Sequence, residues 1–248
     1  MLETVLDRYQ AIDPAKLGLR PSGRLLDVGC GTGRHLLELS RHSGTLVGLD
    51  FALDDLRAMR YMFAITAKER PVAATVHIVR GGGERLPFPA SSFDQVICTE
   101  TLEHVPDDRA ILCELMRVLR PGGVVAISVP DEYSERLLWR LSPRYRNTPG
   151  GHVRIYRRKD IKRLVQEGGA QPFAVEYRHS LETVRWVVHS VVDREWGKPG
   201  LITRGIRWLL DSPSHRNWRV LAWADALGSY VLPKSIVLYG RKLERRAP

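Results

Sequence analysis

The chain has 248 residues, of which 44% are hydrophobic and 27% are charged. This length and apolar content predict one large soluble domain, or one domain with a sizeable insertion. No apolar run approaches the roughly 18 to 20 residues that span a bilayer, and the N-terminus lacks the pattern of a signal peptide. We therefore expect a cytoplasmic protein, with contact at a membrane surface left open.

The net charge of +10 is concentrated in the second half of the chain. Residues 1–130 hold 15 basic and 16 acidic side chains, whereas residues 131–248 hold 23 basic and 12 acidic side chains and all six tryptophans. This asymmetry predicts a nearly neutral front part and a basic, aromatic rear part that meets something anionic. The three cysteines have no repeated spacing, so we predict neither a disulfide framework nor a zinc cluster, and no metal site.

The front part alternates between short apolar runs and amphipathic stretches. Helical spacing of apolar residues over 1–20 predicts a leading helix. Strands are predicted at 24–29, 45–50, 75–79, 93–98 and 124–129, and helices at 34–41, 54–67 and 107–119. Strands that alternate with helices predict an α/β fold with a doubly wound parallel sheet, whose ligands bind beyond the carboxyl ends of the strands.

The alternation of strand-like and helix-like stretches becomes less regular after Asp131. We predict a loop at 142–152, a helix at 158–167 that ends at Gly168 and Gly169, and a strand at 173–179. Helical segments are expected within 180–232, followed by a last strand at 235–242.

A glycine-rich turn follows the first predicted strand and reads Asp27-Val28-Gly29-Cys30-Gly31-Thr32-Gly33. The dinucleotide fingerprint needs its third glycine three residues after the second, at the position of Arg34. In this chain the third glycine is Gly33, which is only two residues after Gly31. The phosphate-binding P-loop also fails, because no Gly-Lys-Ser or Gly-Lys-Thr follows. Asp27 suits a cationic ligand better than a pyrophosphate.

Residues 25–33 resemble the first motif of class I S-adenosylmethionine-dependent methyltransferases. Further stretches that resemble the family follow in the expected order, at 48–50, 84–89, 93–98, 102–105, 119–123 and 151–156. The later ones are similar to the small-molecule branch typified by the ubiquinone and menaquinone biosynthetic methyltransferases. The resemblance covers about residues 20–178 and leaves out residues 180–232.

The resemblance implies a Rossmann-like, seven-stranded sheet with a helical insertion before the last strand. It divides the chain into an N-terminal helical lid (1–22), an S-adenosylmethionine-binding core (23–179), a basic, Trp-rich helical insertion or cap (180–232), and the last strand with the tail (233–248). S-Adenosylmethionine is the implied cofactor and S-adenosylhomocysteine the product.

The resemblance also assigns the cofactor contacts. The glycine-rich turn with Asp27 would hold the methionine side, Asp50 the ribose, and Glu84 and Leu86 would flank adenine. The implied cofactor-binding set is Asp27, Gly29, Cys30, Gly31, Gly33, Asp50, Phe51, Glu84, Leu86 and Thr99. Two of these assignments stay open, since Asp50 could cap the following helix and Phe51 could pack into the core instead of against adenine.

One loop departs from the family pattern. The family usually has Gly-Asp-Ala before the Glu, with the Asp side chain on the adenine amino group, whereas this chain has Gly81-Gly82-Gly83-Glu84. Recognition of adenine must then rest on backbone groups, on Glu84 or on a neighbour.

Methyl transfer is an in-line displacement, so a base is needed only when the acceptor atom must lose a proton. Glu100 and His104 follow the fourth predicted strand, near where the resemblance places the methyl group, and His152 lies on an Arg-rich segment. These three residues are the catalytic candidates. His104 could instead cap a helix or pack in the core.

We therefore expect a methyltransferase that acts on a small-molecule or lipid-like acceptor. Arg136, Arg140, Arg144 and Arg146, with Trp139 and Tyr145 between them, could bind such an acceptor, follow a nucleic-acid backbone, or form a solvated face. Nucleic acid is the less favoured partner, because no Asp-Pro-Pro-Tyr type motif follows the fourth strand. A protein methyltransferase and a non-catalytic cofactor-binding protein are also compatible with the sequence, which does not indicate an oligomeric state.

Overall fold

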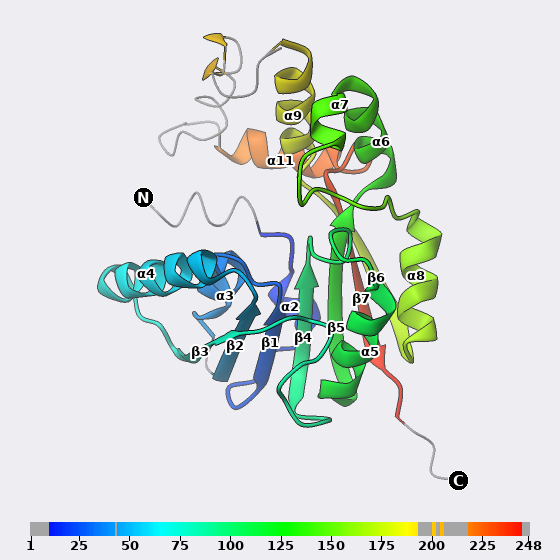
Figure 1. Cartoon of the computed structure of the whole chain (residues 1–248). Coiled ribbons are helices and arrows are strands. Elements are labelled where there is room, and N and C mark those ends of the chain that lie inside the picture. Colours follow the sequence, from blue (N-terminus) through cyan, green and yellow to red (C-terminus); the bar gives the residue numbers. More distant parts are fainter. Residues whose placement is uncertain (1–9, 43, 193–199, 202–203, 206–217, 245–248) are drawn as a thin grey trace.

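The computed structural model describes residues 10–42, 44–192, 200–201, 204–205 and 218–244. Its centre is a seven-stranded sheet in the order β3-β2-β1-β4-β5-β7-β6 (Figure 1). The strands are β1 (Arg24–Val28), β2 (Gly44–Asp50), β3 (Ala74–Arg80), β4 (Phe93–Thr99), β5 (Leu119–Pro130), β6 (Ala170–Arg178) and β7 (Ser235–Lys242). The order reverses between β1 and β4, and the carboxyl ends at that point are where a doubly wound fold binds its ligand.

Five of the strands pair in parallel, and only β7 is antiparallel to its two neighbours, β5 and β6. Along β1, the side chains from Leu25 to Val28 are all buried. Such unbroken burial is typical of a parallel strand that is covered by helices on both faces.

Helices cover both faces of the sheet. The helices of the layers are α2 (Pro14–Leu17), α3 (Arg34–Leu39), α4 (Leu53–Glu69), α5 (Asp108–Val118) and α8 (Arg158–Glu167). One core cluster joins the sheet to α5 and α8, and the other joins it to α2, α3 and α4. This arrangement confirms the predicted doubly wound α/β class.

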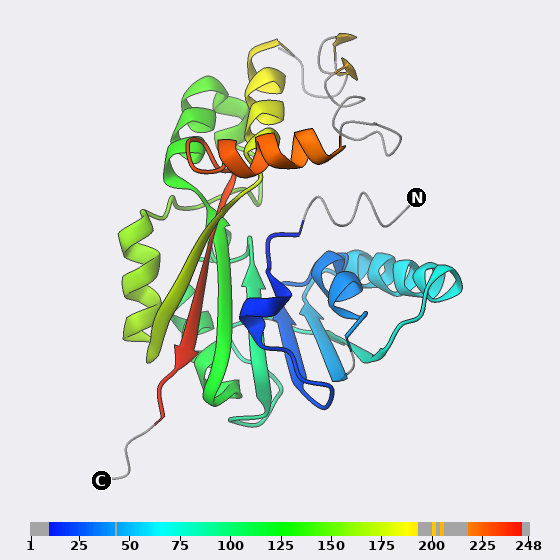
Figure 2. The same ribbon diagram turned by 180° about the vertical axis from the view of Figure 1, so that it is seen from behind.

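A cap of helices stands at the carboxyl ends of the parallel strands (Figures 1 and 2). It consists of α6 (Glu132–Leu141), α7 (Pro143–Arg146), α9 (Ser180–Val192) and α11 (Trp218–Gly228). Helix α9 packs against both α6 and α11, and α7 packs against α6. The topology explains this position, because β5 and β6 end at the edge of the sheet where the antiparallel β7 begins.

Most predicted elements are present within a few residues of their predicted bounds, and α8 and β7 match them. No element is predicted for residues 132–141, where the structure forms α6, and the loop predicted at 142–152 is wrong in part, because residues 143–146 form α7. Within the predicted leading helix only α2 is described, and residues 1–9 lie outside the described residues. Trp196 and Trp208 of the predicted insertion also lie outside them.

Candidate functional site

The glycine-rich turn joins β1 to α3 and uses left-handed backbone at each of its glycines. The φ angles of Gly29, Gly31 and Gly33 are 75°, 50° and 78°. A Cβ at Gly29 would lie 2.3 Å from the Oγ1 of Thr101, and one at Gly33 would lie 2.5 Å from the Cγ of Met59. A Cβ at Gly31 would meet no atom within 4 Å, so this residue exposes bare backbone to an open space. A ligand can therefore lie directly against the chain at Gly31.

Asp27 lies at the base of this turn and is fully buried. Neither of its carboxylate oxygens has a hydrogen-bond partner within the described part of the chain. Burial raises the pKa of Asp27 to about 7, with a further contribution from the nearby charge of Asp50, although Arg34 opposes the shift. Because an unpaired buried carboxylate is costly, Asp27 needs a partner, and a cationic ligand would supply one.

Asp50 ends β2 and is positioned by two backbone amides. Its Oδ2 accepts a hydrogen bond from the Gly31 amide and its Oδ1 accepts one from the Ala52 amide, both at 2.8 Å. Helix α4 begins at Leu53 with Ala52 as its N-cap, so Asp50 also supports the start of that helix. The carboxylate therefore joins the two loops that follow β1 and β2. Each oxygen keeps a second lone pair, with which it can accept a bond from a ribose hydroxyl.

Phe51 is exposed, which excludes one of the two alternatives that the sequence left open for it. Its side chain is 76% exposed, so it does not pack into the core. The ring follows directly after Asp50, at the carboxyl end of β2, where it is free to stack on a flat ligand.

The loop after β3 contains Gly82, which stands where the family pattern has an aspartate. A Cβ at Gly82 would lie 2.7 Å from the Oε2 of Glu84, so the Glu84 carboxylate folds back over the position of the absent side chain. Leu86 differs in character, because its side chain is buried in the core and its amide donates to Glu114 at 2.7 Å. Of the two predicted neighbours of adenine, only Glu84 presents an exposed polar group.

The remaining two residues of the predicted cofactor set, Cys30 and Thr99, are almost fully buried. The sulfur of Cys30 lies 3.9 Å from that of Met59, and burial raises the pKa of the thiol, which makes it a poor nucleophile. The Thr99 carbonyl accepts a hydrogen bond from the Thr101 hydroxyl. Cys30 is thus buried within the turn, and Thr99 is buried at the end of β4.

The acceptor side begins where β4 ends. Glu100 has a left-handed φ of 49°, which is uncommon for a residue other than glycine. Its amide donates to the Ser128 carbonyl at 2.9 Å, and its carboxylate accepts from the Ser128 hydroxyl. Two bonds to β5 thus hold this residue in a strained conformation directly beyond the carboxyl end of β4.

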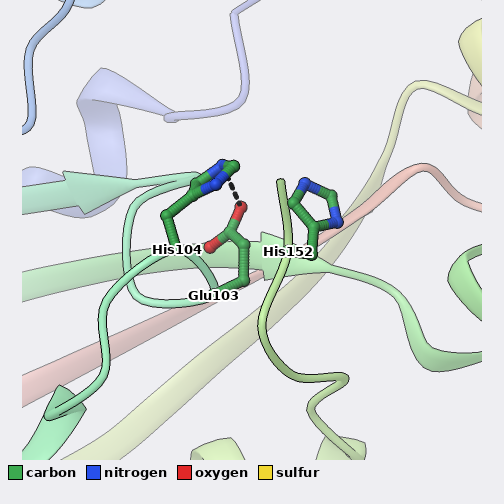
Figure 3. Close-up of side chains that lie close together, drawn as sticks. All are labelled: Glu103, His104 and His152. Atoms are coloured by element: carbon green, nitrogen blue, oxygen red, sulfur yellow. Dashed lines mark ion pairs between the residues drawn. The ribbon is translucent and has the colours of Figure 1, made fainter. Parts of the chain in front are cut away.

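Glu103, His104 and His152 form a compact cluster (Figure 3). The Nε2 of His104 lies 3.9 Å from the Oε1 of Glu103, and the centroids of the two imidazole rings are 4.8 Å apart. Glu103 is fully buried, and its oxygens accept no hydrogen bond within the described residues. Burial raises the pKa of Glu103 well above its usual value, and the charge of Glu100 adds to the shift.

Glu135 of α6 is a site residue that the sequence patterns do not reveal. It is 1% exposed and accepts hydrogen bonds from the Nδ1 of His152 and the Nε1 of Trp139, both at 2.6 Å. The Tyr145 hydroxyl donates to its second oxygen at 3.2 Å, and the Lys234 ammonium lies 3.7 Å away. Burial opposes ionisation, but the bond from His152 and the charge of Lys234 hold the pKa of Glu135 below its usual value.

The structure thus brings the predicted residues together in two groups. The cofactor group lies around β1 and β2, and the acceptor group of Glu100, His104 and His152 lies beyond β4 and under the cap. The cofactor group fits S-adenosylmethionine, since Asp27 is an orphaned carboxylate for its cationic methionine end and Gly31 is a cradle that a side chain would fill. The fold and this site define a class I S-adenosylmethionine-dependent methyltransferase.

Comparison with known proteins assigns the same class. Residues 26–127 match a family model described as "Methyltransferase domain". The chain is 30% identical over 179 residues to a sterol 24-C-methyltransferase of Yarrowia lipolytica. The matched region is 67% of this chain and 43% of that protein. The chain is also 32% identical over 143 residues to a ubiquinone biosynthesis O-methyltransferase of Paracidovorax citrulli, covering 55% of this chain and 58% of that one. The chain therefore belongs to the small-molecule branch of the class and spans about half the length of these relatives.

A solved structure agrees with the fold over nearly the whole chain. The YcgJ protein from Bacillus subtilis superposes with a TM-score of 0.59 at 20% sequence identity, and the match covers 93% of this chain and 96% of that one. At this level of identity the likeness bears on the fold alone.

Proposed function

We propose that the chain transfers the methyl group of S-adenosylmethionine to an oxygen, nitrogen or carbon atom of a small or lipid-like acceptor. The observation that carries the proposal is the unpartnered carboxylate of Asp27 beneath the open backbone at Gly31. The names of the matched relatives support the acceptor class, since they refer to sterols and to ubiquinone biosynthesis.

Bound in this cradle, the cofactor supplies an electrophilic methyl group on a positively charged sulfur. An acceptor atom held in line with it would form a bond to the methyl carbon as the sulfur–carbon bond breaks, and the electron pair of that bond would stay on sulfur. The chain aligns the two reactants and keeps water out, for which the cap over the carboxyl ends of the strands is suitably placed.

An acceptor that must lose its proton needs a base on the acceptor side. His152 is suited to this work, because the ionised Glu135 accepts a hydrogen bond from its Nδ1 and leaves Nε2 to accept a proton. Glu135 would also stabilise the imidazolium that forms. His104 is the second candidate, and its Nδ1 likewise donates to the Gly150 carbonyl, at 2.9 Å.

The basic rear part offers a surface for acceptor recognition. The four arginines singled out in the sequence are exposed on α6 and α7, and the guanidinium of Arg146 lies 5.3 Å from the centroid of the Trp139 ring. This surface favours an anionic acceptor or the surface of the membrane that holds a lipid-like one. No helix in the described ranges is long and apolar enough to cross a bilayer. A cytoplasmic location remains a prediction.

A labelling experiment tests the proposal and separates it from transfer to RNA or protein and from cofactor binding without turnover. The protein is incubated with S-adenosylmethionine that carries a tritiated methyl group, in the presence of a lipid extract, total RNA and denatured protein. We expect label in the fraction extractable into organic solvent, and none with the Asp50→Ala variant. Label in RNA or protein would overturn the acceptor class, and cofactor binding without any transfer would establish a non-catalytic binding protein.

The basic surface has its own test, the paired substitution Arg136→Ala and Arg140→Ala. We expect the variant to lose sedimentation with phosphatidylserine vesicles and to bind S-adenosylhomocysteine as the wild type does. Unchanged sedimentation would make these arginines a solvated face.

A further inference from the structure

We propose that Glu103, His104 and His152 form a binding site for one divalent transition-metal ion of the zinc type. Each of the three residues offers one ligand atom, and these atoms all lie within 4.8 Å of one another. In Figure 3 the Glu103 carboxylate lies between the two imidazole rings. Two imidazoles and one carboxylate are a donor set that suits zinc, iron or manganese rather than calcium.

The hydrogen bonds of the two histidines fix which nitrogen is free to bind a metal. The acceptors are the Glu135 carboxylate for His152 and the Gly150 carbonyl for His104, so Nδ1 must donate in both cases. In the neutral form of each ring, Nε2 is then the nitrogen that carries the lone pair and can bind a metal. Metal-binding histidines characteristically donate their other ring nitrogen to a carboxylate or a backbone carbonyl, and both arrangements occur here.

Glu103 provides an independent indication of a cation. Its side chain is 1% exposed, and no donor within the described residues bonds to either oxygen. The nearest cationic candidate is the ring of His104, at 3.9 Å, which is beyond hydrogen-bond length. A divalent cation would satisfy the buried carboxylate, which nothing else in the described part of the chain does.

The two segments that carry the ligands are fastened to each other. The Val153 amide donates to the Glu103 carbonyl at 2.8 Å, and the Arg154 guanidinium donates to the Val105 carbonyl at 2.7 Å. These bonds connect the turn after β4 with the segment that precedes α8. In a tetrahedral zinc site with bonds of about 2.1 Å, neighbouring ligand atoms lie about 3.4 Å apart. The separation of 3.9 Å between Glu103 and His104 must therefore shorten by about 0.5 Å, and a separation at the 4.8 Å limit of the cluster by about 1.4 Å, which side-chain rotation has to supply.

Three protein ligands leave at least one coordination position open. The site lies beside Glu100, on the acceptor side, so a hydroxyl or phenolate oxygen of the acceptor could take that position. A metal ion there would replace the histidine base, because both Nε2 atoms would be coordinated: it would lower the pKa of a bound hydroxyl so that the proton passes to water, and it would orient the oxygen toward the methyl group. This role rests on the proposed function, whereas binding of the metal does not.

Metal binding is tested on the full chain after treatment with EDTA and dialysis. Zn²⁺ is titrated by calorimetry, and Co²⁺ is added separately to obtain its visible absorption spectrum. We expect one equivalent of Zn²⁺ to bind, and a Co²⁺ spectrum typical of four- or five-coordination. The Glu103→Gln and His152→Ala variants should lose binding by about 100-fold or more, and Glu135→Gln by about 10- to 100-fold through the lost orientation of His152. His77→Ala is the matched control, because His77 is an exposed histidine on β3.

Melting temperatures with and without Zn²⁺ distinguish a variant that has lost the metal site from one that does not fold. Without metal, Glu103→Gln should fold and unfold in one cooperative transition as the wild type does, because glutamine has nearly the volume of glutamate, yet Zn²⁺ should no longer raise its melting temperature. Absence of Zn²⁺ binding to the wild type, or an equal loss in His77→Ala, would overturn the site. Binding of S-adenosylhomocysteine is measured in parallel. If it persists while metal binding fails, the metal site falls and the proposed function stands.

Discussion

The cofactor side and the acceptor side of the site are built in different ways. On the cofactor side, residues 27–52 lie close together in the sequence, and the polar contacts are made by backbone amides and a few carboxylates. On the acceptor side, the contacts run between side chains of distant segments, such as Glu135 with His152 and with Lys234. The first arrangement depends on local turns, whereas the second exists only after the cap has folded onto the sheet. The cofactor side should therefore tolerate changes in the cap, and the following predictions test that separation.

The largest expected effect is on the pH dependence of stability through Asp27. Its pKa is about 7 in the folded chain, against about 3.9 when unfolded, so the folded state binds more protons in that interval and stability falls as the pH rises from 4 to 7. Asp27→Asn should remove this loss and be more stable than the wild type above pH 7, by up to about 4 kcal/mol. Urea denaturation across this pH range measures the difference. Asp54→Asn is the control, because that side chain is 94% exposed. If the free energy of unfolding depended on pH in the same way in the wild type and in Asp27→Asn, the result would contradict the account.

The next effect concerns the open backbone of the cradle. Gly31→Leu places a side chain in space that the chain leaves free, so binding of S-adenosylhomocysteine should weaken by about 100-fold, or about 3 kcal/mol. Gly18→Leu is a matched control, because Gly18 has a φ of 62° and open space at its Cβ but lies at the end of α2. Calorimetry on both variants separates steric blocking from backbone strain. Equal affinities would show that the ligand does not lie against Gly31.

On the acceptor side, Glu135→Ala should lower the free energy of unfolding by about 2 to 3 kcal/mol. His152, Trp139 and Tyr145 would each lose a buried acceptor. Affinity for S-adenosylhomocysteine should remain within twofold of the wild type if the two sides are independent. A parallel loss of cofactor binding would show that the cap and the cradle are coupled.

The smallest effect is expected at Phe51. Phe51→Ala removes an exposed ring, so the free energy of unfolding should change by less than about 0.5 kcal/mol. Loss of stacking on adenine should weaken binding of S-adenosylhomocysteine by about 1 kcal/mol, or roughly fivefold. Calorimetry and urea denaturation give the two values. Tyr61→Ala on α4 is a control with a similarly exposed ring, and an equal change in its affinity would remove Phe51 from the site.

The difference between the two sides also explains what could be predicted from the sequence. The strands and the glycine-rich turn follow from apolar runs and glycine spacing, which act over a few residues. Helix α6 is not predicted because its buried face carries Ser134 and Glu135 as well as Leu138, and a search for apolar residues does not count those two polar side chains. Asp131 is a usable signal, since it caps the helix and is followed by acidic residues in the first turn. Glu135 itself could not be found in this way, because a glutamate on a helix is normally solvated and its partners come from other segments.

The central claim is that the loops after β1 and β2 bind the adenosyl cofactor, and calorimetry with S-adenosylhomocysteine on the wild type and Asp50→Ala tests it most directly. The account predicts one binding site in the wild type, affinity at least tenfold lower in Asp50→Ala, and no binding of NAD. Absence of binding to the wild type, full binding by Asp50→Ala, or equal binding of NAD would contradict it.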